Sequence, residues 1–318
     1  MVGLSWLLLW FACTPAPKTC EQGNAVRCFN DGRDHAEARG VPKDLSRAAE
    51  LYRLACDGGV LEGCTNLGAL YQEGEGVAVD LSQATQLNAR ACEGGIPVSC
   101  YNLGLLELDA GEPAAAAKHF DIACKGQQIT ACYNLGVLYS EGRGVVQDQA
   151  KGAALYARAC KEGVAEACLN LGLGYATGAG VPKDDDQAML MYQDACEGGI
   201  HLACYNLALH LQEGEGVTKD LTRAAALYQG ACDHGVMLAC SNLGLAYQSG
   251  AGVPQDEARA VALFQRVCDD GTPLGCLNLG LAYIDGKGVA QDRARAAAMF
   301  KRACEGGIED TCGVLDER

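Results

Sequence analysis

The chain has 318 residues, of which 49% are hydrophobic, 6% aromatic and 20% charged. Forty acidic and 25 basic residues give a formal net charge of -15, which argues against nucleic acid and against an anionic membrane surface as the main partner. No run of about 18 apolar residues occurs after the N-terminus, so no membrane span is predicted in the body of the chain. The 19 cysteines and 41 glycines are the unusual features, and the cysteine number is odd.

The N-terminal segment, residues 1–12, is predicted to be an export signal. It is largely apolar but too short to span a bilayer stably. Cys13 follows it directly, and residues 13–19 have the composition of a linker. This arrangement resembles a bacterial lipobox, which implies that Cys13 is lipidated. Trp10 and Phe11 fit a lipobox poorly and no basic residue precedes the segment, so simple secretion from a misassigned start and a plain apolar tail remain alternatives.

The other eighteen cysteines form pairs eight residues apart, and successive pairs start 36 residues apart except for one step of 32. A fixed period of this size predicts a repeat architecture. The pairs are Cys20–Cys28, Cys56–Cys64, Cys92–Cys100, Cys124–Cys132, Cys160–Cys168, Cys196–Cys204, Cys232–Cys240, Cys268–Cys276 and Cys304–Cys312.

Each unit between cysteine pairs is predicted to be two helices. The first begins near the second cysteine of a pair, carries apolar residues at helical spacing and ends at a G-x-G loop, where left-handed backbone is easily adopted. The second follows an aspartate suited to capping and runs through alanines to an aromatic residue and the next cysteine. No strand pattern competes, so the predicted fold is all-α. The capping aspartates are Asp44, Asp80, Asp148, Asp184, Asp220, Asp256 and Asp292.

Each cysteine pair straddles the tight corner between the second helix of one unit and the first helix of the next. A disulfide there closes a short loop and is expected to stabilise the fold by about 2–3 kcal/mol. Zinc is the alternative, but zinc sites usually have closer cysteines and often histidine. Disulfides are favoured, and they require an oxidising compartment.

The motif A-C-Y-N-L-G-x-x-Y-x-x-G-x-G-V-x-x-D, seen at residues 131–148, resembles the Sel-one-like repeat, which is related to the tetratricopeptide repeat. The added cysteine pairs resemble the cysteine-rich Hcp-like branch of that family. The resemblance implies a right-handed α/α solenoid of eight two-helix repeats over residues 20–312, followed by a tail at residues 313–318. It also implies an exported bacterial scaffold or adaptor, in the periplasm, on the outer membrane as a lipoprotein, or secreted.

The sequence departs from the repeat pattern at a few positions. The 32-residue unit has Asp109-Ala-Gly-Glu-Pro113 in place of the G-x-G-V-x-x-D loop. Gln127 stands where other corners have glycine, Ala208 replaces the N-L-G glycine, and Asn88 replaces the aromatic residue of the second helix. These departures predict local irregularity without loss of the fold.

The search for chemistry favours a protein that is not an enzyme. No serine lies in an S-x-x-K motif and no histidine in an H-x-H motif, and neither a metal nor a cofactor is predicted. His201 and His210 are predicted to be exposed residues on helices. A β-lactam-binding protein or weak β-lactamase remains the alternative, because cysteine-rich members of the resembled family are described in that way.

Binding of a protein or peptide is the favoured function. Counted from the second cysteine, offsets 1, 5, 8 and 9 lie on one face of the first helix, and resemblance to tetratricopeptide solenoids makes it the concave face. Its aromatic, carboxamide and acidic residues suit an extended peptide with basic residues. The alternative is that the tyrosines only pack, the asparagines lock the corners and the acids are solvated. The predicted binding residues are Tyr101, Tyr133, Tyr205, Asn102, Asn134, Asn206, Glu73, Glu141 and Glu213.

Overall fold

A computed structural model describes residues 20, 23–215 and 217–312. The predicted export signal, the predicted lipidation of Cys13 and the predicted tail lie outside these residues. The described residues contain sixteen α-helices and a short 3-10 helix but no strand, so the all-α prediction is confirmed. The chain divides into two compact units, residues 1–128 and 129–318, which are treated separately below.

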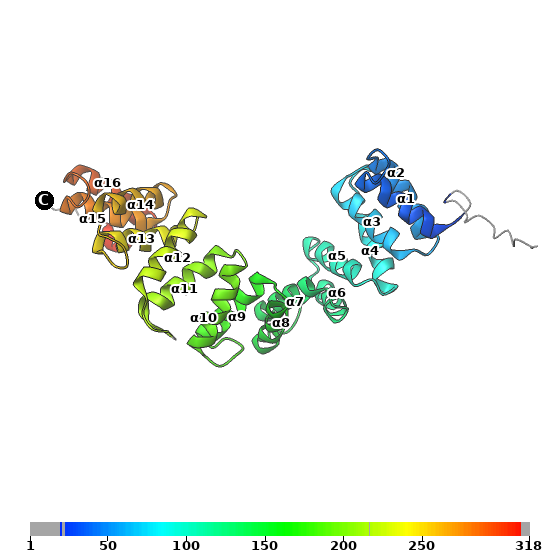
Figure 1. The fold of residues 1–318 in the computed structure, drawn as a ribbon, viewed down its shortest axis with the longest axis horizontal. Helices are drawn as coiled ribbons and strands as arrows, with labels where there is room; N and C mark the ends of the chain where they lie inside the picture. Colours follow the sequence, from blue (N-terminus) through cyan, green and yellow to red (C-terminus); the bar gives the residue numbers. More distant parts are fainter. Residues whose placement is uncertain (1–19, 21–22, 216, 313–318) are drawn as a thin grey trace, which may run out of the picture. The chain divides into compact units, whose positions relative to one another are not determined.

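The α-helices are uniform, since each has 13 residues. Figure 1 labels them in chain order. The first unit contains α1 (Ala25–Glu37), α2 (Leu45–Asp57), α3 (Leu61–Glu73), α4 (Leu81–Glu93), α5 (Pro97–Asp109) and α6 (Pro113–Lys125). The second contains α7 (Ile129–Glu141), α8 (Gln149–Lys161), α9 (Ala165–Thr177), α10 (Asp185–Glu197), α11 (His201–Glu213), α12 (Leu221–Asp233), α13 (Met237–Ser249), α14 (Glu257–Asp269), α15 (Pro273–Asp285), α16 (Arg293–Glu305) and the 3-10 helix η2 (Glu309–Thr311).

The second helix of seven repeats begins at the predicted aspartate cap. In each case the carboxylate accepts a hydrogen bond from the backbone N–H three residues later, as from Gln187 to Asp184 at 3.0 Å. The backbone N–H of the same aspartate donates to the preceding first helix, as to the Tyr175 carbonyl at 3.0 Å. The aspartate therefore starts one helix and closes the loop onto the other. α6, in the 32-residue repeat, has no side-chain cap and begins at Pro113 instead.

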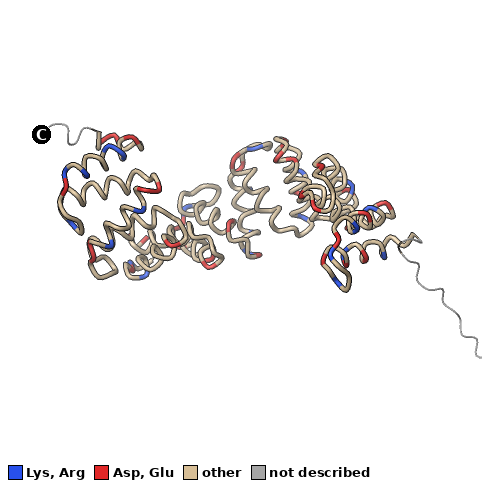
Figure 2. Tube along the Cα trace, turned by 90° about the horizontal axis from the view of Figure 1, so that it is seen from above, with Lys and Arg blue, Asp and Glu red and all other residues tan. Residues whose placement is uncertain are grey.

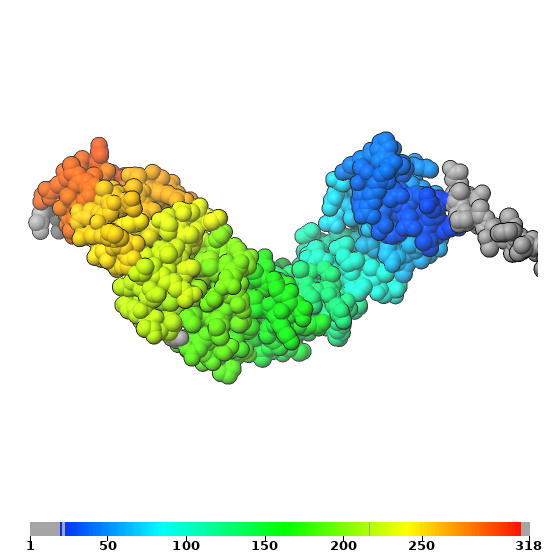
Figure 3. All heavy atoms as spheres, viewed as in Figure 1, coloured from blue at the N-terminus to red at the C-terminus, as the bar shows by residue number. Residues whose placement is uncertain are grey.

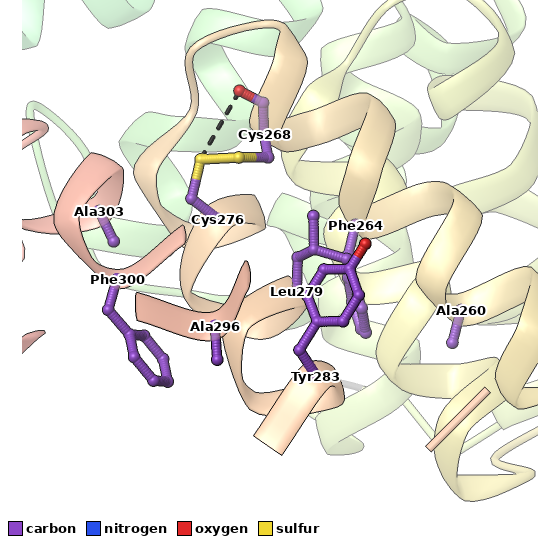
Figure 4. Close-up of a cluster of buried hydrophobic side chains, with 9 residues drawn as sticks. All are labelled: Ala260, Phe264, Cys268, Cys276, Leu279, Tyr283, Ala296, Phe300 and Ala303. Carbon is purple, nitrogen blue, oxygen red and sulfur yellow. Dashed lines mark hydrogen bonds between the residues drawn. A yellow bond between two sulfur atoms is a disulfide. The ribbon is translucent and has the colours of Figure 1, made fainter. Parts of the chain in front are cut away.

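Within a repeat, the glycine of the N-L-G motif lies under the aromatic ring of the second helix. A Cβ atom on Gly244 would lie 2.5 Å from the Phe264 ring, and one on Gly280 would lie 2.6 Å from the Phe300 ring. Figure 4 shows Phe264 and Phe300 in a cluster with Leu279 and a corner disulfide. The motif glycine thus sets the close approach of the two helices.

Successive repeats pack in chain order within each unit, as the bands of colour in Figure 3 show. The second glycine of the G-x-G loop makes one of these contacts. Glycine is required there because a side chain would clash with the backbone of the preceding repeat. A Cβ atom on Gly252 would lie 2.0 Å from the backbone oxygen of Leu221, at the start of the preceding repeat's second helix. The same close approach joins Gly180 to Gln149 and Gly288 to Glu257. Each loop therefore rests directly on the backbone of the repeat before it.

The corners are closed by disulfides, which confirms the predicted pairing and leaves these sulfurs unavailable as zinc thiolates. Eight bridges have Cα–Cα distances of 4.5–5.1 Å: Cys20–Cys28, Cys56–Cys64, Cys92–Cys100, Cys160–Cys168, Cys196–Cys204, Cys232–Cys240, Cys268–Cys276 and Cys304–Cys312. Cys124 and Cys132 are disulfide-bonded as well. The predicted fold class, a solenoid of two-helix repeats with a disulfide at each corner, is confirmed.

Gln127 occupies a backbone conformation that suits glycine. Its φ is 69°, in the left-handed region, whereas Gly163 has φ 90° at the equivalent corner with open space around its Cβ position. Gln127→Gly is therefore expected to raise the free energy of unfolding by about 0.5–1 kcal/mol, because it relieves left-handed strain. Urea denaturation with intact disulfides measures the shift. Gly163→Gln is the matched reverse change and should destabilise; stabilisation by both or by neither would contradict the backbone argument.

Candidate functional site

Two grooves in the second unit are lined at equivalent positions of different repeats. The first groove has a volume of about 350 Å³ and is lined by Tyr133, Val137, Ser140, Glu141, Gln149, Ala153, Tyr156, Asn170, Leu173, Gly174, Thr177 and Ala179. The second groove has a volume of about 270 Å³ and is lined by Gln212, Glu213, Lys219, Leu221, Ala224, Ala225, Tyr228, Asn242, Leu245, Ala246, Ser249 and Ala251. Most members of the second set lie two repeats after a member of the first.

Each groove is built by three consecutive helices and the loop that follows them. α7, α8 and α9 form the first groove, and α11, α12 and α13 form the second. The loop forms one wall of the groove through Ala179 in the first groove and Ala251 in the second. Each alanine precedes the glycine that packs on the preceding repeat. The contact that spaces the repeats therefore also shapes the grooves.

The apolar lining of each groove includes one exposed leucine of a first helix. Leu173 is 40% exposed and Leu245 is 43% exposed, although both belong to otherwise well-packed first helices. They stand at offset 5 from the second cysteine, where every complete repeat from the second onward has an aliphatic residue: Ala69, Leu105, Val137, Leu173, Leu209, Leu245 and Leu281. This periodic signal was available in the sequence, but the predicted binding residues did not include it.

Tyrosine and asparagine form the polar part of the grooves. Asn170 hydrogen-bonds to Tyr133 and Tyr156 of the preceding repeat. In the second groove, Tyr228 donates a hydrogen bond to Oε1 of Gln212 at 3.1 Å, and burial raises the pKa of Tyr228 to about 12. The phenol is protonated at neutral pH, as an unshifted tyrosine would be, and its proton is used in the hydrogen bond to Gln212.

Acidic side chains lie at the edge of both grooves. Glu141 and Glu213 are exposed and occupy the same position in their repeats. Glu141 pairs with Arg143 at 3.4 Å, and because both side chains are about half exposed, this ion pair contributes little stability. Many charged positions lie at helix ends and in loops (Figure 2). The carboxylates remain accessible to a basic ligand.

The prediction that His201 and His210 are exposed is wrong. His210 is only 8% exposed, because it stands at the position that Gly174 and Ala246 occupy in the two grooves. Its ring centroid lies 5.5 Å from that of Tyr192, and its Nδ1 lies 3.8 Å from a carboxylate oxygen of Glu215. His210 thus occupies, in the intervening repeat, the space that the small residues leave open in the grooves.

His201 is partly buried rather than exposed. Its ring stacks on that of His234, with the ring centroids 3.7 Å apart and the planes inclined by 18°. The sequence placed these two histidines at opposite ends of one repeat, but a contact between them depends on how the corners pack.

Of the nine predicted binding residues, Tyr133, Glu141 and Glu213 line the grooves. Tyr205 packs on Tyr228 with ring centroids 6.0 Å apart, and Tyr101, in the first unit, packs on Phe120 at 5.9 Å. Glu73 is exposed, and the three asparagines Asn102, Asn134 and Asn206 are partly buried. The structure therefore brings three of the predicted residues to the grooves, and the binding role of all nine stays a prediction.

The two groove serines already have hydrogen-bond partners. Ser249 donates to the Leu245 carbonyl at 2.8 Å, and Ser140 hydrogen-bonds to Tyr156. The predicted β-lactam alternative gains no specific arrangement from them and stays a prediction.

Among the described residues, one group of potential metal ligands comes together, formed by Cys160, Cys168 and Asp194. Its two cysteines form a disulfide and cannot act as thiolate ligands. No helix in the described part of the chain is long and apolar enough to cross a membrane.

Stacked helix pairs with a disulfide at each corner and grooves along the first helices define a helical-repeat scaffold. The chain belongs to the Sel1 repeat family, whose model matches residues 27–60, 61–96, 129–164, 165–200, 201–236, 238–271 and 273–308. The unmatched residues between the second and third matches include the 32-residue repeat with the altered loop. Sel1 repeat proteins generally mediate protein–protein interactions. No curated protein matches the chain.

Two solved structures share the fold over most of this chain. A protective antigen of uropathogenic Escherichia coli with an SLR fold is 27% identical, with a TM-score of 0.87 over 92% of this chain. The present chain spans 63% of that protein's length. A Sel1 repeat protein from Oxalobacter formigenes is 28% identical, with a TM-score of 0.71 over 93% of this chain and 88% of its own. Helicobacter pylori cysteine-rich protein B is 30% identical, with a TM-score of 0.34 over 40% of this chain and 93% of its own.

Proposed function

We propose that the protein is an exported scaffold that binds an extended, partly basic segment of a protein partner in the first and second grooves. The observation that carries this proposal is the recurrence of one groove at equivalent positions two repeats apart. Ligands of repeat proteins commonly run along such periodic surfaces. A single polypeptide segment that crosses both grooves would gain from both sites, because the second contact is then intramolecular.

The side chains that line the grooves support a ligand that has both apolar and basic residues. Leu173 and Leu245 offer exposed apolar surface for an aliphatic or aromatic side chain. Glu141 and Glu213 offer accessible carboxylates at the same relative place, in a chain whose net charge is -15. Lysine or arginine next to an apolar anchor would complement both features and speed association at low salt.

Export is supported by the disulfides. Bridges at every repeat corner form and persist in an oxidising compartment outside the cytoplasm. Lipidation of Cys13 would anchor the scaffold in the bacterial envelope, and periplasmic or secreted forms lack that anchor. Intact-mass spectrometry of the protein isolated from its cells reports an acyl chain on Cys13 directly, and a mass that retains residues 1–12 would count against export.

The binding proposal is tested with a display library of 12-residue peptides selected on the purified protein. Enriched peptides are expected to combine basic and apolar residues. Leu173→Ser and Leu245→Ser should each weaken their binding about tenfold, since each removes about 1.4 kcal/mol of apolar contact. Glu141→Gln and Glu213→Gln should reduce both the affinity and its dependence on salt.

Leu202→Ser and Leu238→Ser are the matched controls. These leucines are 44% and 42% exposed, close to the values for Leu173 and Leu245, but they line neither groove. Leu238 and Leu245 even lie on the same helix, α13. Peptides that bind the groove variants as tightly as the native protein, or that respond equally to the control variants, would refute the grooves as the binding site.

A further inference from the structure

The corner disulfides differ in how well the following repeat covers them. At three corners an arginine of the next second helix reaches back to the first cysteine. Arg90 donates to the Cys56 carbonyl at 2.9 Å, Arg266 to the Cys232 carbonyl at 3.0 Å, and Arg302 to the Cys268 carbonyl at 2.7 Å. The three covered cysteines, Cys56, Cys232 and Cys268, are 1%, 0% and 0% exposed, respectively.

Arg266 also covers the disulfide sulfur itself. Its Nη1 lies 3.6 Å from Sγ of Cys232, so the guanidinium packs against that sulfur and covers part of it. The arginine stands two residues before the first cysteine of its own repeat. The residue at this position can therefore be compared across corners.

Exposure of the first cysteine rises as the covering side chain is lost. Ile122 replaces the arginine next to Cys92, which is 6% exposed. Asp194 replaces it next to Cys160, which is 9% exposed.

Gly230 replaces the arginine at the Cys196 corner, and a Cβ atom there would meet nothing within 4 Å. Cys196 is partly exposed; of the other corner cysteines from Cys28 to Cys276, Cys160 comes nearest at 9%, and the rest are more deeply buried.

The second cysteine of this bridge is also more exposed than the second cysteine of any other internal bridge. Cys204 is 7% exposed, whereas its counterparts at the other internal corners are at most 3% exposed: Cys28, Cys64, Cys100, Cys132, Cys168, Cys240 and Cys276. Both sulfur-bearing residues of one bridge are thus less covered than those elsewhere in the interior of the chain.

Two stacked imidazoles lie between this corner and the next. His201 lies within the loop that the Cys196–Cys204 bridge closes, and His234 follows α12 inside the loop that the Cys232–Cys240 bridge closes, so the pair does not distinguish the two corners. His234 Nδ1 is 2.9 Å from the Gly230 carbonyl.

We propose that Cys196–Cys204 is the internal site of thiol–disulfide exchange between this protein and an external dithiol. A thiolate of the dithiol attacks Sγ of Cys196, the Cys196–Cys204 bond breaks, and the Cys204 sulfur leaves as a thiolate that takes up a proton. The second thiol then attacks the mixed disulfide and releases Cys196 as a thiolate. The external dithiol becomes a disulfide, and the protein gains two thiols. The proposal is independent of ligand binding in the grooves.

The test is partial reduction of the folded, full-length protein by dithiothreitol without denaturant. Samples are quenched with N-ethylmaleimide at intervals, digested with trypsin and analysed by mass spectrometry. Both cysteines of this bridge fall in the single tryptic peptide 184–219, and those of Cys232–Cys240 fall in peptide 224–259. The Cys196–Cys204 peptide is expected to acquire label at least about tenfold faster than the Cys232–Cys240 peptide, because access controls the exchange rate.

Variants at residue 230 test whether access to the Cys196–Cys204 disulfide controls its rate of reduction. Gly230→Arg and Gly230→Leu should slow reduction of Cys196–Cys204 to the rate of Cys232–Cys240. The leucine variant tests cover without a charge that would stabilise a thiolate. Gly230→Ala stabilises the helix without adding cover and should leave the fast reduction unchanged. Arg266→Gly should speed reduction of Cys232–Cys240.

The terminal bridge Cys304–Cys312 serves as a positive control, because Cys312 is exposed. Equal reduction rates at the covered and uncovered internal bridges would overturn the proposal. So would a Gly230→Ala variant that slows reduction as much as Gly230→Arg, since helix stability rather than cover would then control the reaction.

Discussion

Gly252→Ala is expected to lower the free energy of unfolding by about 3 kcal/mol or more. Two effects add at this position. The residue has φ 75°, which costs an L-residue with a Cβ atom about 1–2 kcal/mol. The new Cβ atom would also lie 2.0 Å from the Leu221 carbonyl oxygen and 2.8 Å from the Thr222 nitrogen, and backbone cannot rotate away as a side chain can. The loop must therefore separate from the preceding repeat.

Gly250→Ala is the matched control in the same loop. Its φ is 74°, but the nearest atom to its Cβ position is Cβ of Gln255 at 3.5 Å, an ordinary contact. This variant should cost only about 1 kcal/mol. The midpoint of urea unfolding with intact disulfides measures both changes. Equal losses at the two glycines would show that the Gly252 contact does not hold the repeats together.

The same contact links stability to the candidate site. Leu221 and Ala251 line the second groove, and Gly252, which follows Ala251 in the chain, packs against the Leu221 carbonyl. Gly252→Ala is therefore also expected to weaken peptide binding in the second groove more than in the first. One substitution is expected to change both stability and peptide binding, because a single backbone contact sets both the repeat spacing and the groove width.

The sequence predicted helix positions well because local rules determine them. The aspartate at each predicted cap accepts the expected hydrogen bond, and the cysteine spacing matched the corner geometry. It also identified both glycines of each G-x-G loop as turn residues. It could not show that only the second, such as Gly252, touches the preceding repeat, since that depends on the packing of one repeat on another.

The candidate site was predicted less completely for the same reason. Glu141 and Glu213 follow from helical periodicity, and the structure places both at groove edges. Leu173 was missed because an aliphatic residue on a helix is usually buried, and its 40% exposure appears only after three helices pack. His210 was wrongly predicted to be exposed, because its repeat position faces Tyr192 rather than solvent.

Asn88 is a departure from the repeat pattern with an energetic cost. It stands where the other second helices have an aromatic ring, and its side chain is fully buried. Its Nδ2 donates to the Ala84 carbonyl at 2.9 Å, but its Oδ1 has no hydrogen-bond partner. A buried acceptor without a partner costs about 1–3 kcal/mol, so the site already lowers the stability of the first unit.

Asn88→Asp is expected to lower the free energy of unfolding by about 3 kcal/mol or more at pH 7, although the two side chains have nearly the same shape. The substitution removes the one donor and places a charge where no donor faces it. Burial raises the pKa of the new carboxyl in the folded state above its unfolded value of about 3.9. The loss relative to the native protein should therefore be small below about pH 4 and grow as the pH rises to the folded-state pKa.

Asn88→Leu provides the opposite test at the same site. It removes the unpaired oxygen and adds apolar surface, so it should stabilise the protein by about 1 kcal/mol. Urea unfolding at several pH values measures all three forms. A pH-independent loss in Asn88→Asp would show that the new carboxyl is solvated. A destabilised Asn88→Leu would show instead that the packing around Gly68, whose Cβ position is 2.8 Å from Nδ2 of Asn88, leaves no room for the larger side chain. The two variants together separate the electrostatic cost of this position from its steric limit.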